Sequence, residues 1–197
     1  MRPSFPLFNT PIDLAHHFWK DLLKKQDVVV DATCGNGKDS LALAKILHPL
    51  QGSLLCIDLQ KQAIDATKNL IENEIPSFLP QVQFFHQSHA KLPPTPKEST
   101  VKLIVWNLGY LPKGDKSVTT KTESTWESIV HGMEILSSGG LLSITCYPGH
   151  SEGKKEEEIL LQKLSILDPH LWCFTSFFWA NRKDSPSLFL IQKKDSV

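Results

Sequence analysis

The chain of 197 residues lacks several features that would point to particular classes of protein. Its 21 acidic and 21 basic side chains leave no formal net charge, so any contact with nucleic acid must come from a local patch. Its four cysteines show no C-x-x-C spacing, which argues against a zinc site or a disulfide framework. No apolar run is long enough to cross a membrane, and the amino terminus lacks a signal-peptide core. We therefore expect one cytoplasmic domain, residues 1–197, with reduced thiols, no metal and no membrane contact.

The most informative stretch is residues 28–40. A β-branched run at 28–30 ends in Asp31, a turn with Gly35 and Gly37 follows, and apolar residues then recur at helical spacing from Ser40. This order predicts a buried parallel strand, a tight loop and the start of a helix. The glycines allow a sharp bend and a close approach to a ligand, and the first helical amides are free to bind a polar group.

Two kinds of cofactor use such a turn. Dinucleotide enzymes need a third glycine, and here Ser40 stands in its place. S-adenosylmethionine (SAM) carries a sulfonium cation and an ammonium group, which suit an acid such as Asp31 at the end of a strand. We therefore interpret the turn as a SAM loop, with an ordinary strand–turn–helix joint as the alternative.

The next two expected strands, 52–58 and 82–86, also end beside polar residues. Asp58 lies about 20 residues beyond the glycine loop, where a carboxylate can accept both hydroxyls of an adenosine ribose. The alternative is that Asp58 caps the next helix. Ser88 and His89 follow the third strand, where they contact the adenine or belong to a solvated turn.

A second candidate site follows the expected fourth strand, 102–106. Asn107 and Tyr110 stand in an Asn-x-x-Tyr arrangement, similar to the Asn-Pro-Pro-Tyr motif of amino-methyltransferases. An amide oxygen can hold the N–H groups of an amine, and the aromatic ring can stack on an extruded base. The polar loop 113–121 contains Lys113 and Asp115. It either closes over the substrate or is a solvated surface loop.

Further candidates follow the expected fifth strand, 141–146, and lie in a hairpin with strands at 171–179 and 187–191. Tyr147 and His150 face the same cleft as Asn107, and His150 is either a proton acceptor or a turn-stabilising residue. Asn181, in the hairpin loop 180–186, is a candidate RNA contact.

These patterns predict an α/β, Rossmann-like fold of the class I methyltransferase type. The sheet has seven mostly parallel strands and an antiparallel carboxyl-terminal hairpin, with helices on both faces. A leading helical segment, 1–26, is expected to cover the sheet edge or the cofactor cleft, and its helix is expected to start at Thr10. A capping box at 124–127 is expected to start a helix that Gly139 and Gly140 end, and the charges at 154–158 are expected to be solvated.

Three stretches together resemble a known family. Residues 31–39 (DATCGNGKD), 107–116 (NLGYLPKGDK) and 147–154 (YPGHSEGK) are similar to small bacterial proteins labelled as rRNA methylases, the YtqB or MnmM type. Members are class I SAM-dependent methyltransferases, and characterised ones methylate the amine of 5-aminomethyl-2-thiouridine at the tRNA wobble position. The chain departs from the family at Lys113, where glycine is usual, and at 184–187, where Asn-Pro-Pro-Phe is usual.

The residue patterns and the resemblance together give a set of site residues. The cofactor side comprises Asp31, Thr33, Gly35, Asn36, Gly37, Asp39, Asp58, Gln60, Ser88, His89 and Asn107. The acceptor side comprises the catalytic candidates Asn107, Tyr110, Asp115 and His150, and the substrate contacts Tyr110, Lys113, Tyr147, His150 and Asn181. The implied cofactor is SAM, and the implied partner is the anticodon region of tRNA, bound by a monomer or a homodimer. The alternatives are rRNA or small-molecule N-methylation, and a non-catalytic RNA-binding module on this fold.

Overall fold

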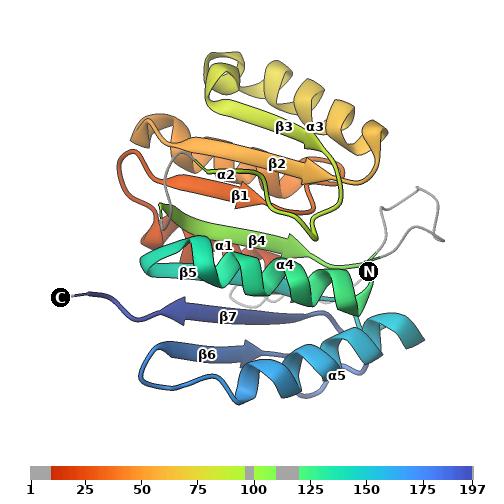
Figure 1. Ribbon diagram of the computed structural model, residues 1–197. Helices are drawn as coiled ribbons and strands as arrows, with labels where there is room; N and C mark the ends of the chain where they lie inside the picture. The colour runs from red at the N-terminus through yellow and green to blue at the C-terminus, as the bar shows by residue number, and fades with distance from the viewer. Residues whose placement is uncertain (1–9, 96–99, 110–119, 197) are drawn as a thin grey trace.

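A computed structural model describes residues 10–95, 100–109 and 120–196 (Figure 1). Its centre is a seven-stranded sheet with the strand order β3-β2-β1-β4-β5-β7-β6. Strands β1 to β5 run parallel, and β7 is antiparallel to both β5 and β6. The strands are β1 Val28–Asp31, β2 Ser53–Asp58, β3 Val82–His86, β4 Val101–Asn107, β5 Leu136–Cys146, β6 Trp172–Phe177 and β7 Ser187–Lys193. This arrangement confirms the predicted fold class, including the antiparallel hairpin.

Helices cover both faces of the sheet (Figure 1). Apolar side chains of α1, α2 and α3 pack into one core, and those of α4 and α5 pack into a second core on the other face. The helices are α1 Pro11–Leu22, α2 Lys38–Leu50, α3 Lys61–Glu74, α4 Thr122–Ile135 and α5 Ser151–Ser165, with a 3₁₀ helix at Pro76–Gln81. Within the described ranges, no helix has the length and apolarity needed to cross a membrane.

The leading helix α1 begins as predicted, because the Thr10 side chain accepts a hydrogen bond from the Asp13 amide at 3.1 Å. It packs on the face of the sheet against β5 and β7, and also contacts α2, so it does not cover a sheet edge. Trp19 is buried and its indole N–H donates to Ser143 Oγ of β5 at 3.0 Å. This buried anchor fixes α1 beside the carboxyl-terminal half of the sheet.

The predicted boundaries of the fourth helix are wrong. α4 begins at Thr122 with Lys121 as its N-cap, and the Ser124 hydroxyl donates to the Lys121 carbonyl instead of capping. At the other end, Gly139 and Gly140 lie inside β5, which already begins at Leu136. The helix therefore ends before the glycines, and the chain enters the sheet directly.

The buried face of α4 carries polar side chains. It consists of Thr125, Ser128, Ile129 and Gly132, while Val130 is exposed. The Trp106 indole N–H donates to Ser128 Oγ at 2.9 Å, which satisfies both polar groups inside the core.

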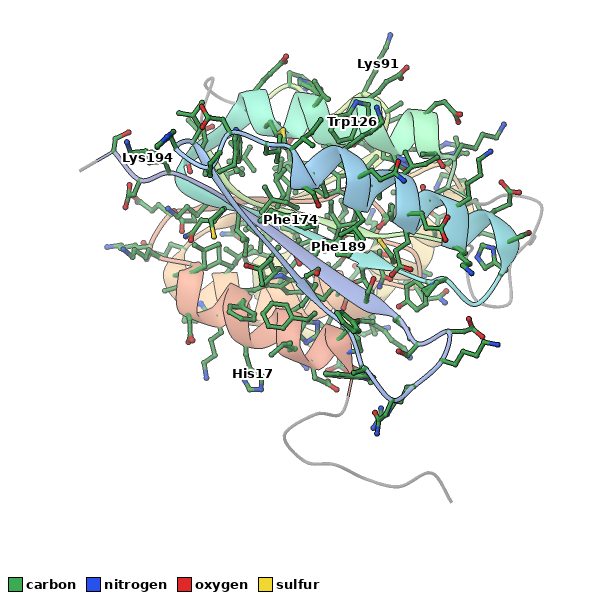
Figure 2. All side chains as sticks on the ribbon, turned by 90° about the horizontal axis from the view of Figure 1, so that it is seen from below. His17, Lys91, Trp126, Phe174, Phe189 and Lys194 are labelled. Atoms are coloured by element: carbon green, nitrogen blue, oxygen red, sulfur yellow. The ribbon has the colours of Figure 1, made fainter. Side chains whose placement is uncertain are left out.

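The carboxyl ends of the parallel strands meet at one edge of the sheet. Asp31 at the end of β1 is level with Cys56 of β2 and Val105 of β4, so Asp58 and Asn107 end their strands close by. The β6–β7 connection returns to the same edge because β6 runs parallel to β5. In the hairpin, Phe174 and Phe189 meet edge to face, with ring centroids 5.4 Å apart (Figure 2).

Candidate active site

A cavity of about 780 Å³ lies at this edge of the sheet. Its size suits a small-molecule cofactor. Three residues predicted for the site, Asp31, Gly37 and Asn181, are not among those that line it. Tyr110, Lys113 and Asp115 lie outside the described residues. The predicted residues that line the cavity are Thr33, Gly35, Asn36, Asp39, Asp58, Gln60, Ser88, His89, Asn107, Tyr147 and His150.

Asp31 lies beneath the glycine loop and not in the cavity. Its side chain is buried, and its carboxylate accepts hydrogen bonds from Ser40 Oγ at 2.6 Å and from the Thr33 amide at 3.2 Å. Burial raises the pKa of Asp31 to about 7. This carboxylate ties the loop to the start of α2. Direct contact between Asp31 and the cation stays a prediction.

The two glycines of the loop have the backbone conformations that motivated the prediction. Gly37 is the N-cap of α2 with φ of 78°, and a Cβ there would lie 2.8 Å from the Cα of Thr67. Gly35 has φ of 53°, and its amide donates to Asp58 Oδ2 at 2.9 Å. The loop is thus held against the end of β2.

Asp58 lines the cavity with both carboxylate oxygens already engaged. Oδ2 accepts from Gly35 and Oδ1 accepts from the Gln60 amide at 2.8 Å. Burial is the main cause that raises the pKa of Asp58. Each oxygen keeps acceptor capacity, so the carboxylate can still take the hydroxyls of a ribose. Gln60, not Asp58, is the N-cap of α3, and the alternative reading of Asp58 as a helix cap is not supported.

His89 offers the clearest sign that the cavity is built for a ligand. Burial lowers the pKa of its ring, so the imidazole is neutral near pH 7. Its Nε2 atom is buried and has no hydrogen-bond partner among the described residues. A buried polar atom left unpaired costs about 1–3 kcal/mol. A ligand nitrogen or oxygen at this position would remove that penalty.

Asn107 is held by two other parts of the chain. Its backbone amide donates to Thr33 Oγ1 at 2.7 Å, and its side-chain Nδ2 donates to Asp39 Oδ2 at 2.8 Å. Because a carboxylate only accepts, the NH₂ group must face Asp39 and the amide oxygen is left for other donors. Burial raises the pKa of Tyr147 to about 12, although its interaction with the Asn107 side chain acts in the opposite direction. The phenol therefore stays neutral.

The other oxygen of Asp39 engages a residue that was not predicted for the site. His16 of α1 places its Nε2 atom 2.9 Å from Asp39 Oδ1. The sequence offered no local signal for this contact, because His16 and Asp39 belong to different helices.

His150 acts as the N-cap of α5. Its Nδ1 atom accepts a hydrogen bond from the Gly153 amide at 3.1 Å. A neutral imidazole whose Nδ1 accepts carries its proton on Nε2. The lone pair that could take a proton is therefore engaged in capping, which favours the turn-stabilising alternative. The role of proton acceptor stays a prediction.

The acceptor side of the cavity is braced by a buried acid. Glu156 of α5 is 4% exposed and accepts hydrogen bonds from Thr120 Oγ1 at 2.8 Å and Thr125 Oγ1 at 2.7 Å. Thr120 Oγ1 also accepts from the Gly109 amide at 3.0 Å. The expectation that the charges of residues 154–158 are solvated is wrong for Glu156, whose pKa is raised by burial.

The hairpin connection borders the cavity through Asp184 and Pro186. At the start of the same connection, Phe178 is 66% exposed. The guanidinium of Arg182 lies 5.7 Å from the ring centroid of Trp179. Asn181 is exposed on the same connection, away from the cavity lining.

Comparison with known proteins identifies the family. The family model described as "Putative rRNA methylase" matches residues 54–193. The chain belongs to this family. This methylase is 34% identical over 190 residues to a protein of Arabidopsis thaliana named "tRNA (mnm(5)s(2)U34)-methyltransferase, chloroplastic". The match covers 93% of this chain and 69% of the plant protein.

Solved structures agree with this assignment. The methylase shares 30% identity and a TM-score of 0.87 with a Clostridium thermocellum protein described as "putative rRNA-methylase", covering 94% of this chain and 98% of that one. It shares 28% identity and a TM-score of 0.82 with a Streptococcus mutans protein described as "a putative methyltransferase" in complex with SAH, covering 94% and 99%. The chain is therefore a methyltransferase, and SAM is its methyl donor.

The residues that line the cavity fit this donor. Asp58 can accept hydrogen bonds from hydroxyl groups, and His89 Nε2 lacks a polar partner. The carboxylate of Asp39 favours a cation near it. When bound, SAM supplies an electrophilic methyl group on a positively charged sulfur. In the part of the chain that the structure describes, no cluster of three or more metal-ligating side chains occurs.

Proposed function

We propose that the enzyme methylates the amine of 5-aminomethyl-2-thiouridine at position 34 of tRNA, giving 5-methylaminomethyl-2-thiouridine. The name of the Arabidopsis relative supports this acceptor. The observation that carries the proposal is the orientation of Asn107. Its NH₂ group is committed to Asp39, so its amide oxygen remains to accept a hydrogen bond from an amine.

The side chains on the acceptor side position the amine. An N–H donated to Asn107 Oδ1 turns the nitrogen lone pair away from the amide, and Tyr147 steadies that amide. The amine must be neutral to react, and the secondary ammonium formed must then release one proton. Asp115, His150 or water takes this proton. Asp115 lies outside the described residues.

On the donor side, Asp58 would hold the ribose hydroxyls and His89 with Ser88 would meet the adenine. Asp39 and Asn36 would lie nearest the charged end of the donor, with Gln60 at the other end. Asp31 would act through the loop that it holds.

The β6–β7 connection would bind the anticodon loop. An exposed Phe178 offers a stacking surface for an unpaired base. Arg182 adds positive charge beside the Trp179 ring, and its two sequence neighbours, Asn181 and Lys183, are exposed on the same connection. The same connection lines the cavity through Asp184 and Pro186, so a nucleotide turned out of the loop would enter beside it.

The acceptor can be tested by nucleoside analysis. Purified enzyme and SAM are incubated with tRNA that carries 5-aminomethyl-2-thiouridine, and the digest is examined by mass spectrometry. We expect the methylaminomethyl nucleoside to appear. The description of the family favours a second candidate, rRNA, so ribosomal RNA from the same cells is the parallel substrate. Methylation of rRNA alone would overturn the proposal.

Replacing Asn107 tests the site itself. Asn107→Ala should leave SAM affinity within about twofold by calorimetry, because Asp58, Ser88 and His89 would still hold the ribose and the adenine. It should lower kcat by at least about 100-fold, because the amine loses the acceptor that aims its lone pair. Asn69→Ala, an exposed residue of α3, is the matched control. Normal turnover in Asn107→Ala would remove Asn107 from the mechanism.

A further inference from the structure

We propose that His16 of the leading helix is a positioning residue for methyl transfer, acting on Asn107 through the carboxylate of Asp39. The inference rests on the role proposed above for Asn107. The residues come from three elements that are distant in sequence: His16 from α1, Asp39 from the first turn of α2, and Asn107 from the end of β4.

The contacts form a continuous chain of hydrogen bonds. His16 Nε2 lies 2.9 Å from Asp39 Oδ1, and Asn107 Nδ2 lies 2.8 Å from Asp39 Oδ2. The Asp39 side chain is only 12% exposed, so water competes little for these oxygens. A carboxylate with a donor on each oxygen cannot rotate without breaking one of the two bonds. His16 therefore fixes the plane of Asp39, and Asp39 fixes the amide.

The position of His16 is itself determined by buried structure. Its ring lies 4.7 Å from the ring of Trp19, centroid to centroid, and Trp19 is buried and bonded to Ser143 of β5. The neighbouring His17 is exposed and projects from the outer side of α1 (Figure 2). Of this histidine pair, His16 is the one bonded to Asp39, which lines the cavity.

The orientation of the amide matters for the reaction. If the Asn107 amide turned over, its NH₂ group would meet the N–H groups of the incoming amine, and donor would oppose donor. Asp39 excludes this arrangement because it only accepts hydrogen bonds. Loss of His16 frees Asp39 to rotate and lets the amide lose its orientation. A small displacement of this kind lowers turnover more than binding.

Two substitutions separate the hydrogen bond from the ring contact. His16→Gln keeps an N–H donor at the position of Nε2 but removes the ring, and His16→Phe keeps a ring against Trp19 but removes the donor. We expect His16→Phe to lower kcat about tenfold with KM for tRNA and affinity for SAM unchanged. We expect His16→Gln to stay within about twofold of the unaltered enzyme, as should the control His17→Gln.

A packing role predicts the reverse order, with His16→Phe active and His16→Gln impaired, and that result would overturn the proposal. Unchanged kcat in both variants would overturn it as well. A second readout does not depend on the acceptor: the side-chain NH₂ protons of Asn107, followed by NMR in the SAM complex. Their exchange with water should quicken in His16→Phe and not in His17→Gln. If the unaltered enzyme methylates another substrate, this NMR comparison still decides the role of His16, because it requires no turnover.

Discussion

At the scale of single residues, the site is distinguished by carboxyl groups that are removed from water and hydrogen-bonded to neighbouring groups. Asp31, Asp58 and Glu156 all have a pKa raised chiefly by burial. Each accepts two hydrogen bonds from neighbouring groups. They brace the loop of the donor side and the wall of the acceptor side, so these acids stabilise the shape of the cavity.

The raised pKa of Asp31 predicts a pH dependence of stability. Its pKa is about 7 in the folded protein and 3.8 ordinarily, so between these values the folded state binds the proton more tightly. The stabilisation is complete below pH 3.8 and is lost as the pH rises to about 7, at about 1.4 kcal/mol per pH unit. Asp31→Asn, which cannot ionise, should lack this slope in urea unfolding between pH 4 and 7. The exposed Asp65→Asn is the control, and parallel curves for Asp31→Asn and the unaltered protein would contradict the prediction.

Residues with a local signature were predictable from the sequence. Asp58 and Asn107 follow buried strands directly, and the topology of a parallel sheet then brings them to one edge. The direction of the Asp31 side chain was not predictable, because the partner that turns it inward, Ser40, had been assigned only to the helix. His16 and Glu156 were missed because their partners lie on other elements, and no local pattern encodes such a contact.

At the scale of elements, the buried face of α4 departs from the usual amphipathic pattern. The sequence patterns assume that apolar residues face the core, yet α4 buries Thr125 and Ser128 because polar atoms across the core bond to them. Gly132 faces the same way, and a Cβ on it would lie 3.0 Å from the ring of Trp106. The close approach of a helix to a large side chain is a tertiary property, which periodicity alone does not contain.

The hydrogen bonds of Glu156 predict that its replacement lowers the free energy of unfolding more than replacement of an exposed acid does. Glu156→Ala leaves the hydroxyls of Thr120 and Thr125 without their acceptor inside the protein, and should reduce the free energy of unfolding by about 2–3 kcal/mol. Glu156→Gln keeps one acceptor oxygen and should lose less. Glu158→Ala, exposed on the same helix, should change it by less than about 0.5 kcal/mol. Thermal unfolding of the three variants ranks them, and equal losses at positions 156 and 158 would refute the assignment.

At the scale of the whole molecule, the absence of net charge limits how RNA can be held. Binding must depend on a local patch, for which we propose the β6–β7 connection at the mouth of the cavity. The opposite edge of the sheet, where α1 ends and β1 begins, carries Lys24 and Lys25, both exposed. The two edges therefore provide a matched comparison.

Removing the charges of the connection should weaken the salt dependence of tRNA binding. In a variant with Arg182→Gln and Lys183→Gln, the slope of log binding constant against log salt concentration should become less negative by about 1 to 1.5. Each phosphate contact to a single strand contributes about −0.7 to this slope. Affinity for SAM should be unchanged. Lys24→Gln with Lys25→Gln should leave the slope as it was. If the two double variants change the slope equally, RNA does not bind the β6–β7 connection preferentially.

The order of the strands has a consequence for synthesis on the ribosome. β7 comes after the other six strands of this sheet along the chain, yet it occupies an inner place between β5 and β6, and most of its side chains are buried. Until residues 187–193 leave the exit tunnel, β6 has no strand to pair with. Helix α1 and β5, which carry Trp19 and Ser143, also lack their contacts with β7. A premature stop codon a few residues upstream of β7 would therefore remove an inner strand of the sheet and not a dispensable tail.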